Sequence, residues 1–230
     1  MESSGFSKLL TRKVPHIHEK ILLSLDYETF MNCQGVCKTW DELLVAESFR
    51  KKAYSLYSEE MDHVLVKNCI SGNAGHVKRL LLRGANPNCI SKYFTHKLPP
   101  LIWSVWTVNI EVTKILLDHG ADINGATENG FTPLSWIMGV CNCPLDMVTL
   151  LLERGADPKK ASKSGTTPLH SAVLKGKSSM AIEVVKALLE HGGYTDRADD
   201  AGQTPLGIAT AMGNGKVIKL IQNASPSNPN

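Results

Sequence analysis

The stretch Leu151-Leu152-Glu153-Arg154-Gly155-Ala156-Asp157, followed by Thr167-Pro168-Leu169, decides the fold because versions of it recur along the chain. The leucine-glycine part occurs four times, with glycines at 84, 120, 155 and 192, so the interval is 35–37 residues. Thr-Pro-Leu recurs at 132–134 and 204–206, and Pro-Pro-Leu stands at 99–101. An interval of this length indicates a stack of small structural units rather than one globular core.

Each residue type in the repeated stretch has a local structural role. Thr accepts a hydrogen bond from the backbone at the start of a helix, and Pro suits the first helical position, whose N–H has no partner within the helix. The leucine pair forms the buried ridge of a second helix, and Gly ends that helix in the left-handed conformation. We therefore expect two short helices and an extended loop in each unit. Because no unit buries its apolar side alone, the units must stack.

These motifs resemble those of ankyrin repeats. The resemblance covers residues 62–224, with units at about 62–95, 96–130, 131–165, 166–202 and 203–224. It implies an all-α fold in which helix-turn-helix units stack into a solenoid, each unit carrying a β-hairpin-like finger. It also implies that His170 is structural and bonds to the backbone between neighbouring units. Residues 1–13 and 225–230 are expected to be flexible tails.

Residues 14–57 do not fit the repeat, and they carry apolar side chains at helical spacing. The stretches 14–15, 21–26 and 36–43, followed by Phe49, resemble an F-box, with Val14 where that family usually has Leu. So small a helical unit leaves an apolar patch, which favours an interface. The resemblance implies that residues 14–57 dock a Skp-type adaptor, and through it cullin and RING subunits. The residues expected to contact the adaptor are Pro15, Ile17, Ile21, Leu22, Leu25, Val36 and Trp40.

The ankyrin resemblance also implies a concave face, lined by the finger tips and by the first helix of each unit. We expect a target protein to bind there, with Trp106 as an aromatic anchor beside Tyr93 and Phe94, whereas Trp103 is expected at a buried position. The alternative is that the long first finger folds back and Trp106 packs under Phe94. The full set expected on this face is Tyr93, Phe94, Trp106, Thr107, Glu128, Asn129, Val140, Lys163, Lys175, Asp199 and Met212.

Asn124 is a candidate hydroxylation site. Leu116 and Asp122-Ile123-Asn124 resemble the pattern that the asparaginyl hydroxylase of ankyrin repeats accepts. The alternative is that Asn124 orders its finger through local hydrogen bonds.

The sequence offers little that points to catalysis, a cofactor or a metal. His16, His18, Cys33 and Cys37 lack the matched pairs typical of zinc sites, and no glycine-rich loop suits phosphate. A net charge of +3 without a dense Lys/Arg stripe argues against nucleic-acid binding. No apolar run approaches the roughly 18 residues that span a bilayer. We therefore expect a non-catalytic protein without cofactors, cytoplasmic or nuclear, and monomeric outside its complex.

Together, these features predict the substrate-recognition subunit of an SCF-type (Skp–cullin–F-box) ubiquitin-protein ligase. The alternative is an ankyrin-repeat scaffold or inhibitor whose residues 14–57 form a helical cap, with no link to a ligase. An effector protein of an intracellular pathogen with the same architecture would share the mechanism but differ in its target.

Overall fold

The computed structural model describes residues 46–224, except 92–93, 95, 140–143 and 177, together with Leu23 and Leu25. Over these residues the secondary structure is helical, without a β-strand. The helices are α5 (Glu47–Ser71), α6 (Ala74–Leu82), α7 (Pro100–Trp106), α8 (Ile110–Asp118), α9 (Pro133–Ile137), α10 (Leu145–Glu153), α11 (Pro168–Leu174), α12 (Ser179–Glu190), α13 (Pro205–Ala211) and α14 (Gly215–Ala224). The predicted all-α solenoid is confirmed.

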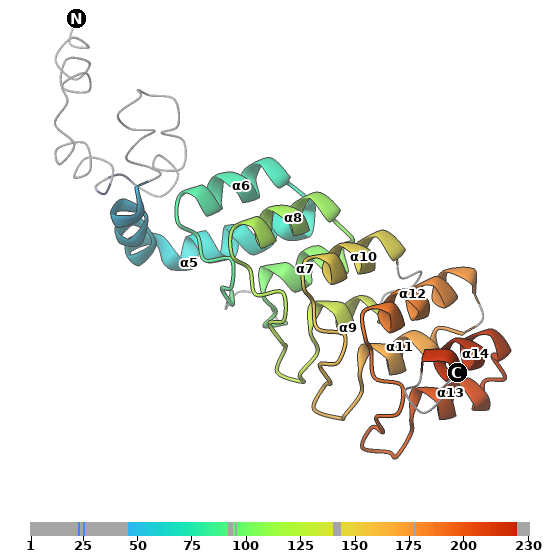
Figure 1. Ribbon diagram of the computed structural model, residues 1–230. Coiled ribbons are helices and arrows are strands. Elements are labelled where there is room, and N and C mark those ends of the chain that lie inside the picture. The colour runs from blue at the N-terminus through green and yellow to red at the C-terminus, as the bar shows by residue number, and fades with distance from the viewer. Residues whose placement is uncertain are drawn as a thin grey trace, which may run out of the picture.

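The helices form two layers (Figure 1). Helices α5, α7, α9, α11 and α13 lie side by side in one layer, which we call the inner layer. Helices α6, α8, α10, α12 and α14 form the outer layer, and each packs against the helix that precedes it in the chain. The loops that lead into the inner helices project from one side of the stack as a row of fingers.

The inner helices begin where the repeated Thr-Pro-Leu motif predicts. The hydroxyl oxygen of Thr132 accepts a hydrogen bond from the backbone N–H of Ser135 at 3.2 Å, and Pro133 occupies the first helical turn. Thr204 caps α13 in the same way, through the N–H of Gly207 at 3.1 Å. These caps satisfy backbone donors that the first helical turn leaves unpaired, so the motif sets the helix start.

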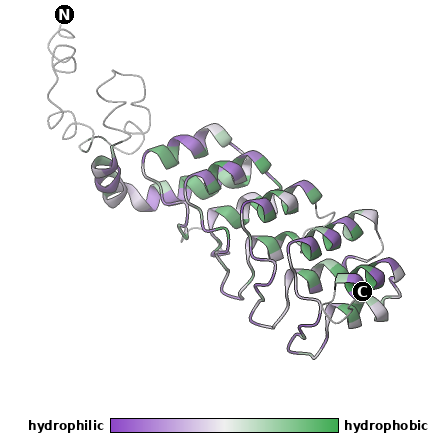
Figure 2. Ribbon diagram, viewed as in Figure 1, coloured by the Kyte–Doolittle hydropathy of each residue, from purple (hydrophilic) through white to green (hydrophobic). Residues whose placement is uncertain are grey.

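The core lies between the two layers. The first leucine of every repeated pair is fully buried there, namely Leu80, Leu116, Leu151 and Leu188. Each such side chain stabilises the fold by about 1.5–3 kcal/mol relative to leaving it exposed. Figure 2 shows that the apolar residues gather on the helices and that few lie on the fingers. Stacking of the units, rather than any single unit, therefore makes the core.

His170 joins one unit to the next. Its side chain is completely buried, and Nδ1 accepts a hydrogen bond from the backbone N–H of Thr167 at 3.2 Å. In the neutral ring Nε2 then carries the proton, and it lies 3.0 Å from the carbonyl oxygen of Gln203 in the following unit. The structural role predicted for His170 is confirmed.

The fingers are hairpin-like turns that bond to one another. Within one finger the N–H of Ser162 donates to the carbonyl of Thr166 at 2.9 Å, and between fingers the N–H of Lys163 donates to the carbonyl of Asn129 at 3.0 Å. Gly130 makes this approach possible, because a Cβ atom there would lie 2.8 Å from the backbone nitrogen of Lys163.

Helix α5 runs from the predicted F-box segment into the first repeat, with non-helical backbone angles at Tyr57. Phe49 and Ala53 are buried in the first core cluster, and Leu25 packs against that cluster and accepts a hydrogen bond from the Tyr57 hydroxyl. Residues 47–57 thus pack on the repeat array, and the division of the chain between 57 and 62 stays a prediction. The other predicted adaptor contacts lie outside the described residues: Pro15, Ile17, Ile21, Leu22, Val36 and Trp40.

None of the helices in the described part of the chain is long and apolar enough to cross a membrane.

Candidate functional site

A continuous row of aromatic side chains crosses the inner layer from the first repeat to the third. In spatial order the row consists of His63, Phe94, Trp103, Trp106, Trp136 and Phe131, and we call it the aromatic row. The centroids of neighbouring rings lie between 5.3 and 6.3 Å apart. These distances fall within the range of favourable aromatic pairs, so each ring positions the next.

Helix spacing explains how the central rings come together. Trp103 and Trp106 are three residues apart on α7 and share one face, whereas Ile102 and Val105 are buried in the core. Trp136 of α9 stands at the repeat position that Trp103 occupies in α7. Because neighbouring inner helices lie side by side, the equivalent faces meet and the rings form one row.

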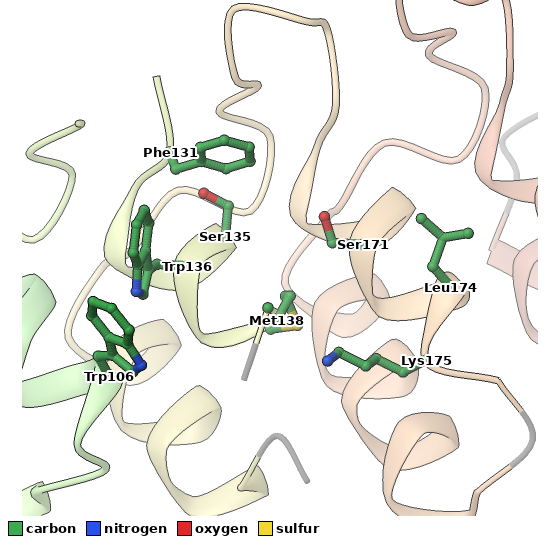
Figure 3. A pocket seen from close by; sticks show the side chains of 9 residues that line it. Trp106, Phe131, Ser135, Trp136, Met138, Ser171, Leu174 and Lys175 are labelled. Carbon is green, nitrogen blue, oxygen red and sulfur yellow. The ribbon is translucent and has the colours of Figure 1, made fainter. Parts of the chain in front are cut away.

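Beside the third repeat, the aromatic row borders a hollow of about 570 Å³ (Figure 3). Trp106 comes from α7 and Trp136 from α9, while Leu174 of α11 and Lys175 stand on the opposite side. Trp106 is 40% exposed and Leu174 is 58% exposed. We call this hollow the aromatic groove, and its lining residues are Trp106, Phe131, Ser135, Trp136, Met138, Gly139, Ser171, Leu174 and Lys175.

The lining of the aromatic groove is mostly apolar. Among its described residues Lys175 is the charged one. The hydroxyl of Ser135 is engaged in the cap of α9, where it accepts from the N–H of Thr132 at 2.7 Å, and Ser171 lines the hollow from α11. The site can therefore hold an apolar group.

The structure brings two of the predicted target contacts, Trp106 and Lys175, together in the aromatic groove. Phe94 lies in the aromatic row but contacts Trp103 and His63, one ring removed from Trp106. Tyr93 and Val140 lie outside the described residues.

Trp103 differs from the expectation of a buried position, because its side chain is only partly buried and stacks on Trp106. It lies on the face of α7 that carries Trp106 and also packs against the first core cluster.

The remaining predicted contacts lie outside the aromatic groove. Glu128, Asn129 and Lys163 are exposed on finger tips, and Thr107 is exposed at the end of α7. Met212 is half-buried and packs against the second core cluster.

The carboxylate of Asp199 hydrogen-bonds to the backbone of its own finger. Its Oδ1 accepts hydrogen bonds from the backbone N–H groups of Ala201 at 3.0 Å and Gln203 at 2.8 Å. Its carboxylate is therefore part of the turn, and a target would meet it only at the remaining oxygen.

The side chain of Asn124 forms hydrogen bonds with the backbone of the following repeat unit. Its Oδ1 accepts from the N–H of Asp157 at 2.8 Å, and its Nδ2 donates to the carbonyl of Gly155 at 3.5 Å. Asn88 makes the equivalent bonds one unit earlier, from the N–H of Asp122 and to the carbonyl of Gly120. These bonds give Asn124 a structural role, and its hydroxylation stays a prediction.

Phe131, Trp136 and Met138 line the groove without having been predicted there, whereas the alignment of the units does place Leu174 at an exposed position of the concave face. A signal for Trp136 was present, since aligning the units places it at the position of Trp103. The alignment predicts a buried residue at that position, and the structure instead places Trp136 in the groove lining.

A second group of titratable side chains lies at the first repeat. The Tyr54 hydroxyl donates to Asp62, 3.2 Å from each carboxylate oxygen, and burial raises the pKa of Tyr54 to about 12. Burial also raises the pKa of Asp62 and of the Cys89 thiol. A thiol with a raised pKa is a poor nucleophile, so this group serves packing rather than chemistry. No cluster suited to a metal ion occurs among the residues placed by the structure.

Stacked helix pairs with a row of bonded fingers and an open groove define a protein–protein interaction module. The chain belongs to the ankyrin-repeat family: the family model described as ankyrin repeats (3 copies) matches residues 63–162 and 137–230. No curated protein matches the sequence significantly. Because the family match begins at residue 63, it leaves the F-box resemblance of residues 14–57 as a prediction.

Proposed function

We propose that this protein is a non-catalytic receptor that holds a target protein in the aromatic groove and presents it to an SCF-type ubiquitin-protein ligase. The observation that carries the target-binding part is the groove itself, a hollow of about 570 Å³ with the exposed indole of Trp106 at its edge. Exposed Trp beside a pocket is the side chain most enriched at binding hot spots.

The ligase part of the proposal rests on the sequence. Residues 14–57 resemble an F-box, and a Skp-type adaptor would dock on the apolar side chains of that segment, including Ile21 and Val36. The adaptor would bring the cullin and RING subunits, while the repeats hold the target on a separate surface. The protein would then act by bringing the target close to the ligase subunits, in the cytoplasm or nucleus, without catalysing a reaction of its own.

Binding of the full chain to a purified Skp-type adaptor tests the ligase link. We expect the wild-type chain to bind, and the Ile21→Ala, Val36→Ala double variant to bind at least about 100-fold more weakly, because truncating buried aliphatic residues costs several kcal/mol. Trp106→Ala is the matched control and should bind the adaptor normally. Equal binding by the double variant would refute adaptor docking through this segment.

A second candidate function, an ankyrin scaffold with a helical cap and no ligase link, is favoured by one observation. Phe49 and Ala53, at the end of the predicted F-box, are buried in the first core cluster, and Leu25 packs against it. A cap would bury these residues in this way. A chain that binds its target but shows no affinity for any Skp-type adaptor would establish this second function.

A further inference from the structure

We propose that the aromatic groove binds a proline-rich segment of the target protein in the polyproline II conformation. This inference rests on the proposed target-binding role and names the chemistry of the partner. Proline rings would pack on the indole faces of Trp106 and Trp136, and a backbone carbonyl of the segment would accept a hydrogen bond from the indole N–H of Trp106.

The three rings at the edge of the groove stand at angles to one another. The planes of Trp106 and Trp136 meet at 62°, and those of Phe131 and Trp136 meet at 77°, so the rings form open corners rather than a flat stack. A corner of this kind offers aromatic surface from two sides to a small, rigid ring such as that of proline. Aromatic-lined grooves are the surfaces on which polyproline II segments dock.

The indole N–H of Trp106 has no hydrogen-bond acceptor among the described residues. Its ring forms aromatic contacts with His96, Trp103 and Trp136 and leaves the N–H unpaired. Trp106 is 40% exposed, and Figure 3 shows its nitrogen on the side of the ring that faces the hollow. A partner that covered this N–H without offering an acceptor would lose binding free energy, because a buried donor without an acceptor is costly.

The need for an acceptor beside apolar rings separates the backbones that a bound segment can adopt. An α-helix uses its carbonyl groups internally. A β-strand adds to the edge of a sheet, and the described part of the chain contains no strand with which it would pair. A polyproline II segment has no internal hydrogen bonds, so its carbonyls are free, and each proline removes an N–H that would itself need an acceptor. Polyproline II is therefore the backbone that meets both demands.

A phage-displayed library of random peptides, panned against the full chain, tests the proposal. We expect the enriched peptides to share prolines at positions i and i+3, because polyproline II has three residues per turn and such prolines lie on one edge. Replacing both prolines with Ala in a synthetic copy should weaken binding at least about 10-fold, since the copy loses both the rings and the rigid backbone.

Removal of the indole N–H alone supplies the specific test. Benzothienylalanine in place of Trp106 keeps the bicyclic ring but has sulfur instead of the N–H, and it should weaken the enriched peptide about 5-fold, the effect of one lost hydrogen bond. Trp136→Ala, which removes a ring face, should weaken it at least about 10-fold. Tyr194→Phe is the matched control, because Tyr194 is a similarly exposed aromatic residue outside the groove lining, and it should change affinity less than about 2-fold.

The chain itself carries prolines at this spacing, Pro226 and Pro229, beyond the described residues. The proposal assigns the groove to a target protein rather than to this segment. The Pro226→Ala, Pro229→Ala double variant of the full chain should therefore bind the enriched peptide within about 2-fold of wild type. A gain of at least about 10-fold would show that the C-terminal segment competes for the groove and would overturn the proposal.

Other results would also overturn the proposal. Peptides that need Trp106 and Trp136 but carry no proline, or that bind the benzothienylalanine variant at full strength, would refute this inference and leave the target-binding role standing. Peptides indifferent to both Trp106→Ala and Trp136→Ala would refute the role of the groove as well. Failure to enrich any peptide would refute the inference, since the groove would then not recognise a short segment.

Discussion

The indole rings of Trp106 and Trp136, which belong to neighbouring repeats, meet at a centroid distance of 5.7 Å with their planes at 62°. Trp106 also stacks on Trp103 at 5.3 Å with planes 9° apart. One side chain thus joins α7 to α9 and still leaves 40% of its surface exposed. Trp106 therefore has two roles, a contact between repeats and a surface for a partner.

Replacing Trp106 with Ala should lower the free energy of unfolding by about 2–4 kcal/mol. Each aromatic pair of this geometry contributes about 0.5–1.5 kcal/mol beyond the burial of apolar area, and only part of the ring area is buried. Urea denaturation followed by circular dichroism measures the change. A loss above about 4 kcal/mol would identify Trp106 as a core residue instead.

Two finger glycines form a matched pair for a second prediction. Gly130 and Gly202 both have positive φ angles, +82° and +74°, but a Cβ atom would lie 2.8 Å from the Lys163 nitrogen at Gly130 and would have no neighbour within 4 Å at Gly202. Ala at either position should cost about 1 kcal/mol in backbone strain. Gly130→Ala should cost about 1–3 kcal/mol more, because the fingers must separate. Equal losses in a urea titration would show that the fingers are not packed this closely.

Val108 has an unfavourable backbone conformation, with φ at 56°, where the equivalent positions in other repeats hold Gly72 and Gly213. Gly at this position would relieve about 1–2 kcal/mol of strain, which offsets most of the lost side-chain packing and the added chain entropy. Val108→Gly should therefore leave stability within about 1 kcal/mol of wild type. Val64→Gly, at another half-buried valine but within helix α5, should lose at least about 2 kcal/mol. Similar losses in the two variants would contradict the strain at Val108.

Asp62 gives a pH-dependent prediction. Burial raises the pKa of its carboxyl above the usual 3.8, so the folded state binds the proton more tightly than the unfolded state does. The stabilisation from Asp62 is therefore present below its unfolded pKa and is lost as pH rises through the folded pKa.

Asp62→Asn mimics the neutral carboxyl, keeps an acceptor for the Tyr54 hydroxyl and removes this pH dependence. The stability of the variant relative to wild type should rise between about pH 4 and pH 7, modestly because Asp62 is only half-buried. Unfolding free energies of both proteins across this range would show it, and a relative stability that falls with pH would contradict it.

Much of the fold could be predicted from local motifs. Such a motif sets the start or the end of a helix through residues that lie within one turn of it in the sequence. Thr132 and Thr204 mark helix starts, and Gly84 and Gly155 mark helix ends, from their own chemistry. Long-range relations were harder to predict. The hydrogen bond from the Asp157 N–H to the Asn124 side chain joins residues 33 positions apart, and the residues next to Asn124 in the sequence do not indicate it.

The candidate site was predictable only in part for the same reason. Trp106 was found because it stands alone at an exposed repeat position, whereas Trp136 belongs to the groove only once α7 and α9 lie side by side. The length of α5 was also missed, since a helix that crosses from residue 47 to 71 joins two segments that the sequence patterns separate.

The affinity of a target protein for two aromatic variants tests the central claim most directly. Trp106 and Tyr194 are similarly exposed, at 40% and 39%, but only Trp106 lines the aromatic groove. With a target identified by cross-linking to the full chain, Trp106→Ala should weaken binding by at least about 30-fold, the effect of losing a hot-spot residue. Tyr194→Ala should bind the target like wild type. Equal binding by both variants, or a loss confined to Tyr194→Ala, would contradict the assignment of the aromatic groove as the target-binding surface.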